Sequence, residues 1–224
     1  MALTNESWVK AYLSRFALCL ALPLLSTGCG SLLPSWNGGN GRQIVDARLP
    51  RGVEAISLLG DTLRTLPLPA ETRRRYEQQL AEARRAYERA PTDADSIIWY
   101  GRRTAYLGHF RDAIAIYTRG ISLHPYDARL YRHRGHRYIS VREFNNAIVD
   151  FERAARLMDG RPDEVEPDGQ PNAQNRPIGT LRSNINYHLG LAHYLKGDFV
   201  RALPIYRREL QLANNDDRRV SVAH

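Results

Sequence analysis

The feature that most constrains this chain is an internal repeat with a period of about 34 residues. Six positions recur in the same order in two neighbouring segments, and Pro91 and Pro125 have the same spacing. A third copy follows after one further period plus an inserted stretch, 159–179. The aligned positions are Gly101, Phe110, Ala113, Ile114, Tyr117 and Leu123; then Gly135, Phe144, Ala147, Ile148, Phe151 and Leu157; then Gly190, Phe199, Ala202, Leu203, Tyr206 and Leu212. A fixed period of this length predicts a stack of similar units.

Each unit has the pattern of a helix, a turn and a second helix. Ile97, Tyr100 and Thr104 lie three and four positions apart, which places them on one face of a helix. Gly101 and Gly135 fall in the middle of such helices, where Gly is about 1 kcal/mol less favourable than Ala. Because this unfavourable residue recurs at the same place, we expect the neighbouring helix to approach closely there.

The pattern Gly-x-x-Tyr/Thr, then Phe-x-x-Ala-Ile-x-x-Phe/Tyr and a late Pro, resembles the tetratricopeptide repeat (TPR) over residues 94–213. The match is strongest at 135–138 and 144–148. The chain departs from the pattern at five positions: Ile97, Tyr131 and Asn186 replace a typical Trp, Arg134 replaces a Leu, and Asp159 replaces the late Pro. The resemblance implies an all-α, helix-turn-helix solenoid of about three repeats with an N-terminal lead-in helix.

This register divides the chain into eight segments. They are a signal peptide at 1–28, a flexible tether at 29–52, lead-in helices at 53–93, the repeats at 94–127, 128–158 and 183–213, an acidic Pro/Asn-rich insert at 159–182, and the start of a further helix at 214–224. We expect that either this last helix is truncated, or a partner covers the end of the third repeat. The lead-in segment is expected to contain a long helix at 71–89, preceded by a shorter amphipathic helix at 53–66. Terminal elements of this kind cover the exposed face of an end repeat.

The N-terminus has the pattern of an export signal. Lys10 and Arg15 precede an apolar stretch at 16–25, which is too short to span a bilayer core of roughly 30 Å. The sequence Ser26-Thr27-Gly28-Cys29 resembles the lipobox of bacterial lipoproteins, which implies lipidation at Cys29. We therefore expect an exported protein of the cell envelope, lipid-anchored to a membrane. Secretion without lipid, a retained anchor and a chance apolar start are the alternatives.

The residue pattern gives little support to catalysis or metal binding. Both cysteines, Cys19 and Cys29, precede the repeats, so the repeats contain no thiol nucleophile or disulfide. His133 and His136 lie three positions apart, but no nearby acid or Cys completes a ligand set. We expect His136 in the groove and His133 on the outer face. No nucleophile elbow, phosphate-binding Gly loop or His-Glu-x-x-His motif is present, so we expect no enzyme, no cofactor and no metal site.

The TPR resemblance implies that ligands bind in a concave groove against the first helix of each repeat. The groove residues in this register are Arg102, Tyr106, Arg129, Arg132, His136, Asn184, Tyr187 and Tyr194. Guanidinium groups beside aromatic rings suit an extended peptide that carries carboxylates; a merely solvated inner surface is the alternative. The residues expected to pack the repeats together are Gly101, Ala113, Tyr117, Gly135, Ala147, Phe151, Gly190, Ala202 and Tyr206.

The insert between the second and third repeats is acidic. Its five acids are Asp159, Asp163, Glu164, Glu166 and Asp168. One hypothesis is that this insert folds back onto the basic groove, either as an inhibitor or as a structural element.

The net charge of +8 comes almost wholly from arginine, since Lys10 and Lys196 are the only lysines. Acidic residues are mixed among the arginines, and export also argues against nucleic acid as the partner. The sequence therefore predicts a non-catalytic protein–protein interaction scaffold that binds a partner protein or acidic peptide. A nucleic-acid-binding solenoid and an accessory subunit of an enzyme complex are the alternatives.

Overall fold

The computed structural model describes residues 49–50, 52–167 and 179–212. The predicted signal peptide, Cys29, most of the tether, the middle of the insert and the segment 214–224 lie outside the described residues. The described chain contains seven helices and one two-stranded sheet. The predicted all-α solenoid with a lead-in helix is confirmed.

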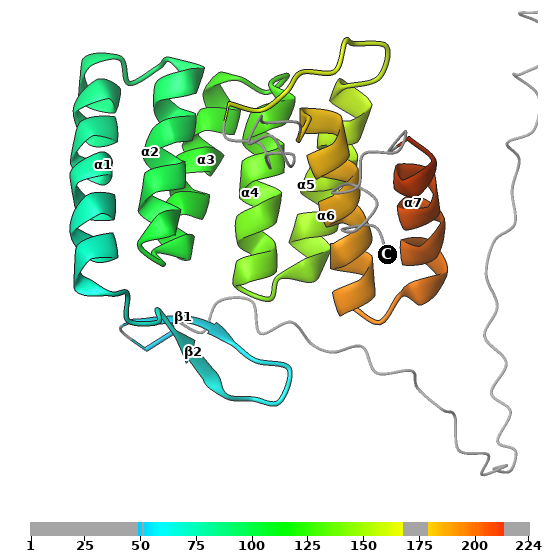
Figure 1. Cartoon of the computed structure of the whole chain (residues 1–224), viewed down its shortest axis with the longest axis horizontal. Helices are drawn as coiled ribbons and strands as arrows, with labels where there is room; N and C mark the ends of the chain where they lie inside the picture. The colour runs from blue at the N-terminus through cyan, green and yellow to red at the C-terminus, as the bar shows by residue number, and fades with distance from the viewer. Residues whose placement is uncertain (1–48, 51, 168–178, 213–224) are drawn as a thin grey trace, which may run out of the picture. The chain divides into compact units, whose positions relative to one another are not determined.

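The helices follow one another across the molecule in sequence order (Figure 1). The lead-in helix is α1 (Ala70–Arg89), and the three repeats are α2 (Ala94–Tyr106) with α3 (Phe110–Leu123), α4 (Ala128–Ser140) with α5 (Phe144–Leu157), and α6 (Leu181–Leu195) with α7 (Phe199–Leu212). Each helix packs on the next, and α4 also contacts both α2 and α6. The first helices of the three repeats therefore form a continuous surface, which we call the inner face.

Each repeat is closed by a contact between a glycine of its first helix and an aromatic ring of its second. The pairs are Gly101 with Tyr117, Gly135 with Phe151, and Gly190 with Tyr206. A Cβ atom on these glycines would lie 2.5, 3.0 and 2.9 Å from the nearest ring carbon. The close approach predicted at Gly101 and Gly135 is thus confirmed. Of the nine residues expected to pack the repeats, Tyr206 is half-buried and the others are buried.

The turn inside each repeat uses a residue with left-handed backbone geometry. Gly108, Arg142 and Gly197 occupy equivalent positions, with φ angles of 83°, 66° and 82°. This conformation suits Gly because a Cβ atom crowds the backbone there. Arg142 is therefore a strained exception in the second repeat.

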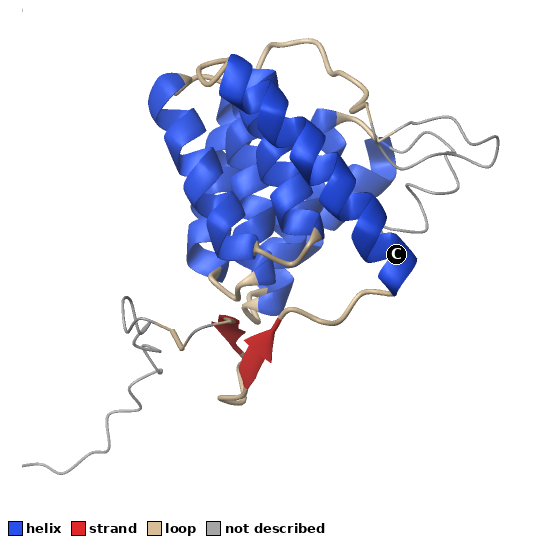
Figure 2. Cartoon of the chain, turned by 90° about the vertical axis from the view of Figure 1, so that its left-hand side faces the viewer, coloured by secondary structure: helices blue, strands red, loops and turns tan. Residues whose placement is uncertain are grey.

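Residues 53–64 form a β-hairpin, so the helix predicted at 53–66 is wrong. Strands β1 (Val53–Ile56) and β2 (Thr62–Arg64) pair antiparallel (red in Figure 2). Val53 and Ala55 are buried while Glu54 between them is only partly buried, which is the period of a strand. The Ser57 hydroxyl closes the turn by accepting hydrogen bonds from two later backbone N–H groups, at 3.2 and 3.0 Å. Such side-chain bonds favour a turn over a helix.

The hairpin is fixed to the first repeat. The Thr65 hydroxyl donates to the Gly108 carbonyl at 3.0 Å. The Glu54 carboxylate accepts from the Arg111 backbone N–H at 3.0 Å, so it caps the first turn of α3. The Arg111 guanidinium also donates to Glu143 at 3.0 Å. One arginine thus joins the hairpin, α3 and the start of α5.

The lead-in helix lies on the first repeat as the sequence predicts. Leu80, Ala83 and Tyr87 are half-buried on one side of α1, and α1 packs on α2. The rings of Tyr87 and Tyr100 stack with centroids 5.0 Å apart. This contact extends the apolar layer beyond the first repeat.

Candidate partner-binding face

The centre of the inner face holds a carboxylate that comes from the insert. Glu166 accepts a hydrogen bond from Arg132 Nη2 of α4 at 2.7 Å and another from Asn184 Nδ2 of α6 at 2.7 Å. The side chains of Glu166 and Arg132 are each only 10% exposed. The described part of the insert therefore folds back onto the predicted groove through Glu166.

Backbone pairing holds Glu166 in this position. Val165 and Thr180 form an antiparallel bridge, in which Glu166 N–H donates to the Gly179 carbonyl at 2.9 Å. The N–H of Leu181, the first residue of α6, donates to the Glu164 carbonyl at 2.8 Å. Figure 1 shows this segment (yellow) leaving α5 and crossing above α4. The insert therefore reaches the inner face as a short extended segment beside the N-terminus of α6.

Three arginines lie near one another on this face, and two of them, Arg132 and Arg102, act on the Glu166 carboxylate. Burial is the main cause that lowers the pKa of Arg132 and of Arg137. Arg102 lowers the pKa of both further, and Arg132 also lowers that of Arg137, so the three guanidinium groups lie near one another. Burial raises the pKa of the Tyr117 hydroxyl well above its usual value, and the same three arginines oppose that rise. The Arg137 guanidinium lies over the Phe110 ring, 5.5 Å from its centroid, and makes no ion pair with any described residue. The centre of this face is therefore strongly cationic.

Burial and charge have opposite effects at Glu166. Burial raises the pKa of its carboxyl group, whereas Arg132, Arg102 and the Asn184 hydrogen bond hold that pKa down. Burial also lowers the pKa of Arg132, but a guanidinium keeps its proton in proteins. We therefore treat Arg132 and Glu166 as an ion pair.

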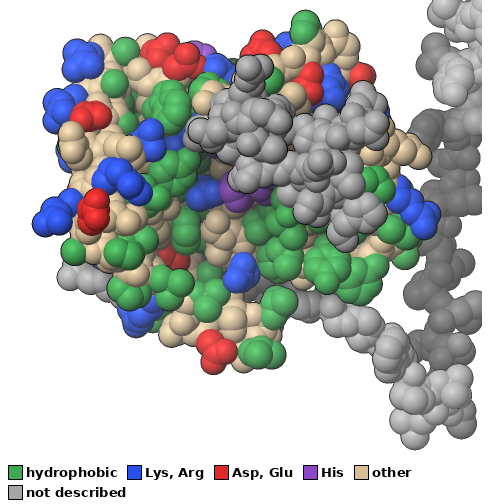
Figure 3. Space-filling view, viewed as in Figure 1, with side chains coloured by type: hydrophobic (Ala, Val, Ile, Leu, Met, Phe, Trp, Pro, Cys, Tyr) green, Lys and Arg blue, Asp and Glu red, His purple; other side chains and the backbone are tan. Residues whose placement is uncertain are grey.

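A row of imidazoles and aromatic rings lies beside the arginines. His136 and His188 have ring centroids 4.3 Å apart, and Tyr187 meets His188 edge-on at 5.0 Å. Figure 3 shows histidine and basic side chains next to one another near the middle of this face. Burial lowers the pKa of His136 and His188, to about 3 for His188, so both rings are neutral near pH 7.

His133 does not lie on the outer face, so that prediction is wrong. The residue is buried, and its ring stacks on Tyr117 at a centroid distance of 5.8 Å. Its Nδ1 accepts from Arg132 Nη1 at 3.0 Å. The reason is that α4 packs against both helices of the first repeat, α2 and α3, so this position of α4 faces the preceding repeat.

The structure brings together five of the eight predicted groove residues. These are Arg102, Tyr106, Arg132, His136 and Asn184. The Arg102 guanidinium lies over the Trp99 ring at 4.6 Å and donates to the Tyr106 hydroxyl at 3.2 Å. Tyr187 lies beside this group, packed against His188 and Tyr206.

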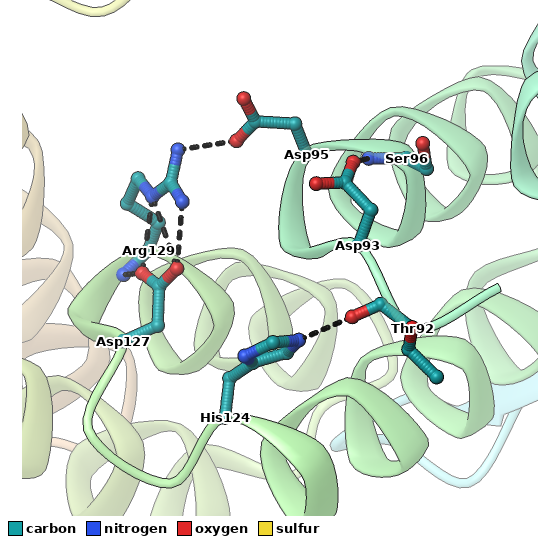
Figure 4. Close-up of polar contacts among 7 residues, drawn as sticks. All are labelled: Thr92, Asp93, Asp95, Ser96, His124, Asp127 and Arg129. Carbon is teal, nitrogen blue, oxygen red and sulfur yellow. Dashed lines mark hydrogen bonds and ion pairs between the residues drawn. The ribbon is translucent and has the colours of Figure 1, made fainter. Parts of the chain in front are cut away.

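Arg129 and Tyr194 lie at the two ends of the face instead. Arg129 pairs with Asp127 at 2.7 Å and with Asp95 at 2.6 Å, so it ties the start of α4 to the start of α2 (Figure 4). In the same junction, His124 Nε2 contacts the Thr92 carbonyl at 2.6 Å (Figure 4). Tyr194 is 54% exposed near the C-terminal end of α6, beside Phe199.

Sequence reasoning misses Arg137 and Glu166 as parts of this face. Glu166 is one of five acids in the insert, and nothing in the sequence distinguishes it from Glu164. Only the pairing of 164–166 with 179–181 selects it.

Two other features are absent from the residues that the structure describes. No group of three or more His, Cys, Asp or Glu side chains there could hold a metal ion. None of the helices in that part of the chain is long and apolar enough to cross a bilayer.

No protein-family model and no curated protein matches the sequence. Several solved structures are similar. The TPR protein YrrB matches with 22% identity and a TM-score of 0.46, over 61% of this chain and 60% of YrrB. The TPR protein TTC0263 of Thermus thermophilus matches with 19% identity and a TM-score of 0.52, over 66% of this chain and 71% of TTC0263. MamA matches with 15% identity and a TM-score of 0.50, over 70% of this chain and 82% of MamA. The match to TTC0263 therefore shows a TPR-like fold, and an identity this low shows the fold alone.

Proposed function

We propose that this chain is a non-catalytic scaffold that binds an acidic segment of a partner protein along its inner face. The observation that carries the proposal is the convergence of Arg102, Arg132 and Arg137, where Asn184 and Arg132 already accommodate one carboxylate. Arginine is the side chain best suited to carboxylate recognition, because its planar group donates parallel hydrogen bonds. Nearby tyrosines and neutral imidazoles add flat apolar surface for the rest of a peptide.

The test is affinity capture of the full chain from its own host, with three baits compared. The wild-type protein is set beside the double variant Arg102→Gln/Arg137→Gln. The control is Arg156→Gln, which removes an exposed charge from α5. A partner held by wild type and control should be lost with the double variant, since a hydrogen bond to a charged group contributes about 1.5–3 kcal/mol. Equal capture by all three baits would exclude the inner face as the binding surface.

We further propose that the scaffold is exported and lipid-anchored through Cys29. The support lies in the sequence, where a basic start and a short apolar stretch precede Gly28-Cys29. Cell fractionation of Cys29→Ser tests it. The variant should leave the membrane fraction, because the acyl chains are then missing; continued membrane association would point to an uncleaved signal anchor instead.

A further inference from the structure

Glu166 differs from every other described acid of the insert in its burial. Asp159, Asp163 and Glu164 are exposed, whereas Glu166 is 9% exposed. Its neighbour Val165 is also exposed, at 53%, so no apolar core draws this segment inward. What holds the side chain in place is the contact of its carboxylate with Arg132 and Asn184.

The contact leaves the arginine incompletely satisfied. Arg132 uses Nη2 for Glu166 and Nη1 for His133, while its buried Nε has no hydrogen-bond partner in the described part of the chain. A carboxylate can bind a guanidinium through two parallel hydrogen bonds, which is the stronger arrangement. Glu166 makes one hydrogen bond to the Arg132 guanidinium. A carboxylate that approaches at a different angle could therefore make two parallel bonds to it.

A buried ion pair also adds little net free energy to hold a loop in place. Removing both charges from water costs nearly as much free energy as their attraction returns, so such pairs often add little net stability. Exchange is different, because replacing one carboxylate with another leaves Arg132 paired throughout. The site therefore favours an exchange of carboxylates over simple opening.

Within the described residues, few hydrogen bonds fasten the segment that presents Glu166. Two backbone hydrogen bonds join 164–166 to 179–181, and the Arg182 N–H donates to the Asp163 carboxylate at 3.0 Å. The Arg182 guanidinium holds the start of the insert separately, through the carbonyls of Met158 and Arg161 at 2.8 and 2.9 Å. Residues 163–166 can thus detach while the insert stays anchored at 158–161.

We propose that Arg132 and Asn184 form a subsite for a Glu or Asp side chain of the partner, and that Glu166 occupies this subsite until the partner displaces it. This inference rests on the proposed function, since it assigns the chemistry and regulation of the same face. Arg137, which makes no ion pair with described residues, offers an incoming acidic segment a second charge that Glu166 does not use. A segment with two carboxylates therefore competes well against the single internal one.

The size of the effect follows from competition. If the subsite is closed in about 90–99% of molecules, the apparent affinity for a partner is reduced about 10- to 100-fold relative to an open site. Removing the Glu166 charge should raise the apparent affinity for the partner by the same factor.

Fluorescence anisotropy with a defined probe tests the exchange. The probe is a fluorescein-labelled octapeptide in which Glu alternates with Ala, titrated into the full chain. Glu166→Gln should bind the probe at least about 10-fold more tightly than wild type. The matched control Glu164→Gln loses the same charge two positions away on an exposed side chain and should bind like wild type. Equal affinity of Glu166→Gln and wild type overturns the proposal.

A second measurement needs no substitution in the insert. Hydrogen exchange of the Glu166 and Leu181 backbone amides is followed in the wild-type chain, with and without saturating probe. Both amides should exchange faster with the probe bound, because displacement breaks their bonds to Gly179 and Glu164. Unchanged protection in the complex means that the insert stays in place, which also overturns the proposal.

The two proposals fail in different ways. If neither the wild type nor Glu166→Gln binds the probe, or if Arg102→Gln/Arg137→Gln binds it as wild type does, the proposed acidic-segment function fails. A different outcome leaves the proposed function intact. If the probe binds to wild type and binds more weakly to the double variant, but Glu166→Gln binds it no more tightly than wild type, only the proposed displacement of Glu166 fails.

Discussion

Arg134 of α4 and Asp150 of α5 form a two-pronged ion pair inside the second repeat, with Nε–Oδ2 and Nη2–Oδ1 distances of 2.8 Å each. Their side chains are 16% and 4% exposed. Burial raises the pKa of Asp150, and its hydrogen bond with Arg134 opposes that rise. The pair explains why Arg134 stands where the TPR pattern has Leu. A charged cross-link replaces an apolar contact between the two helices.

Removing one partner of this pair should be costly. Asp150→Ala is expected to lower the free energy of unfolding by about 3 kcal/mol, because it leaves Arg134 charged and poorly solvated. Arg134→Met/Asp150→Ala should recover most of that loss, since no charge is then left unpaired. Urea denaturation measures both variants. Glu88→Ala, which breaks the exposed Arg84–Glu88 pair, serves as control and should cost under about 0.5 kcal/mol.

The glycine contacts give a second stability prediction. A Cβ atom at Gly101 would lie 2.5 Å from Cε1 of the fully buried Tyr117. We expect Gly101→Ala to destabilise the fold by about 2 kcal/mol, despite the better helix propensity of Ala. Thermal unfolding should show a smaller cost in a Tyr117→Leu background, where the ring is absent. An equal cost in both backgrounds would mean that the ring is not what excludes a side chain.

Replacing Arg142 with Gly should increase the stability of the fold. The Arg142 φ of 66° is positive, as are those of Gly108 and Gly197 at the equivalent turns. Arg142→Gly is therefore expected to raise the free energy of unfolding by about 0.5–1 kcal/mol, by relieving left-handed strain. Among the described residues, the Arg142 side chain makes one long hydrogen bond, at 3.4 Å to the Ile139 carbonyl. Arg142→Ala keeps the Cβ atom and should show no such gain in the same urea titration.

The buried histidines predict that stability depends on pH. Burial lowers the pKa of His188 to about 3, whereas an unfolded histidine titrates near about 6.5. Between these values the unfolded chain binds the extra proton, so His188 stabilises the fold fully above about pH 6.5 and progressively less as the pH falls. Burial lowers the pKa of His133 and His136 in the same direction.

We expect His188→Phe to reduce the slope of stability against pH by up to about 1.4 kcal/mol per pH unit between about pH 6 and 4.5. The raised pKa values of Asp150 and Glu166 give an opposite slope, but they are common to both proteins and cancel in the comparison. Denaturant titrations at a series of pH values measure it. Exposed His109→Asn controls for the loss of one imidazole, and an unchanged slope in His188→Phe would contradict its burial as a neutral ring.

The repeat itself could be predicted because its signal is local and recurs. Helix periodicity, small residues at the helix crossings and the same internal order of positions in each copy all support one another. The same register predicted five of the inner-face residues that the structure brings together, because a position on an α-helix determines which face its side chain joins. The hairpin at 53–64 could not be predicted from local periodicity, because its short strands are stabilised by contacts with distant parts of the chain. Its contacts reach Gly108 from Thr65 and Arg111 from Glu54, across separations of 43 and 57 residues.

The sequence alone thus determined the solenoid, the register of its helices and the basic character of the inner face. Tertiary structure alone decided which charges on that face are paired. Arg129 and Arg132 are both arginines of α4, yet one ties two repeats together and the other binds an acid of the insert. Which carboxylate reaches which guanidinium depends on the path of the insert and on burial, and neither is encoded in local periodicity.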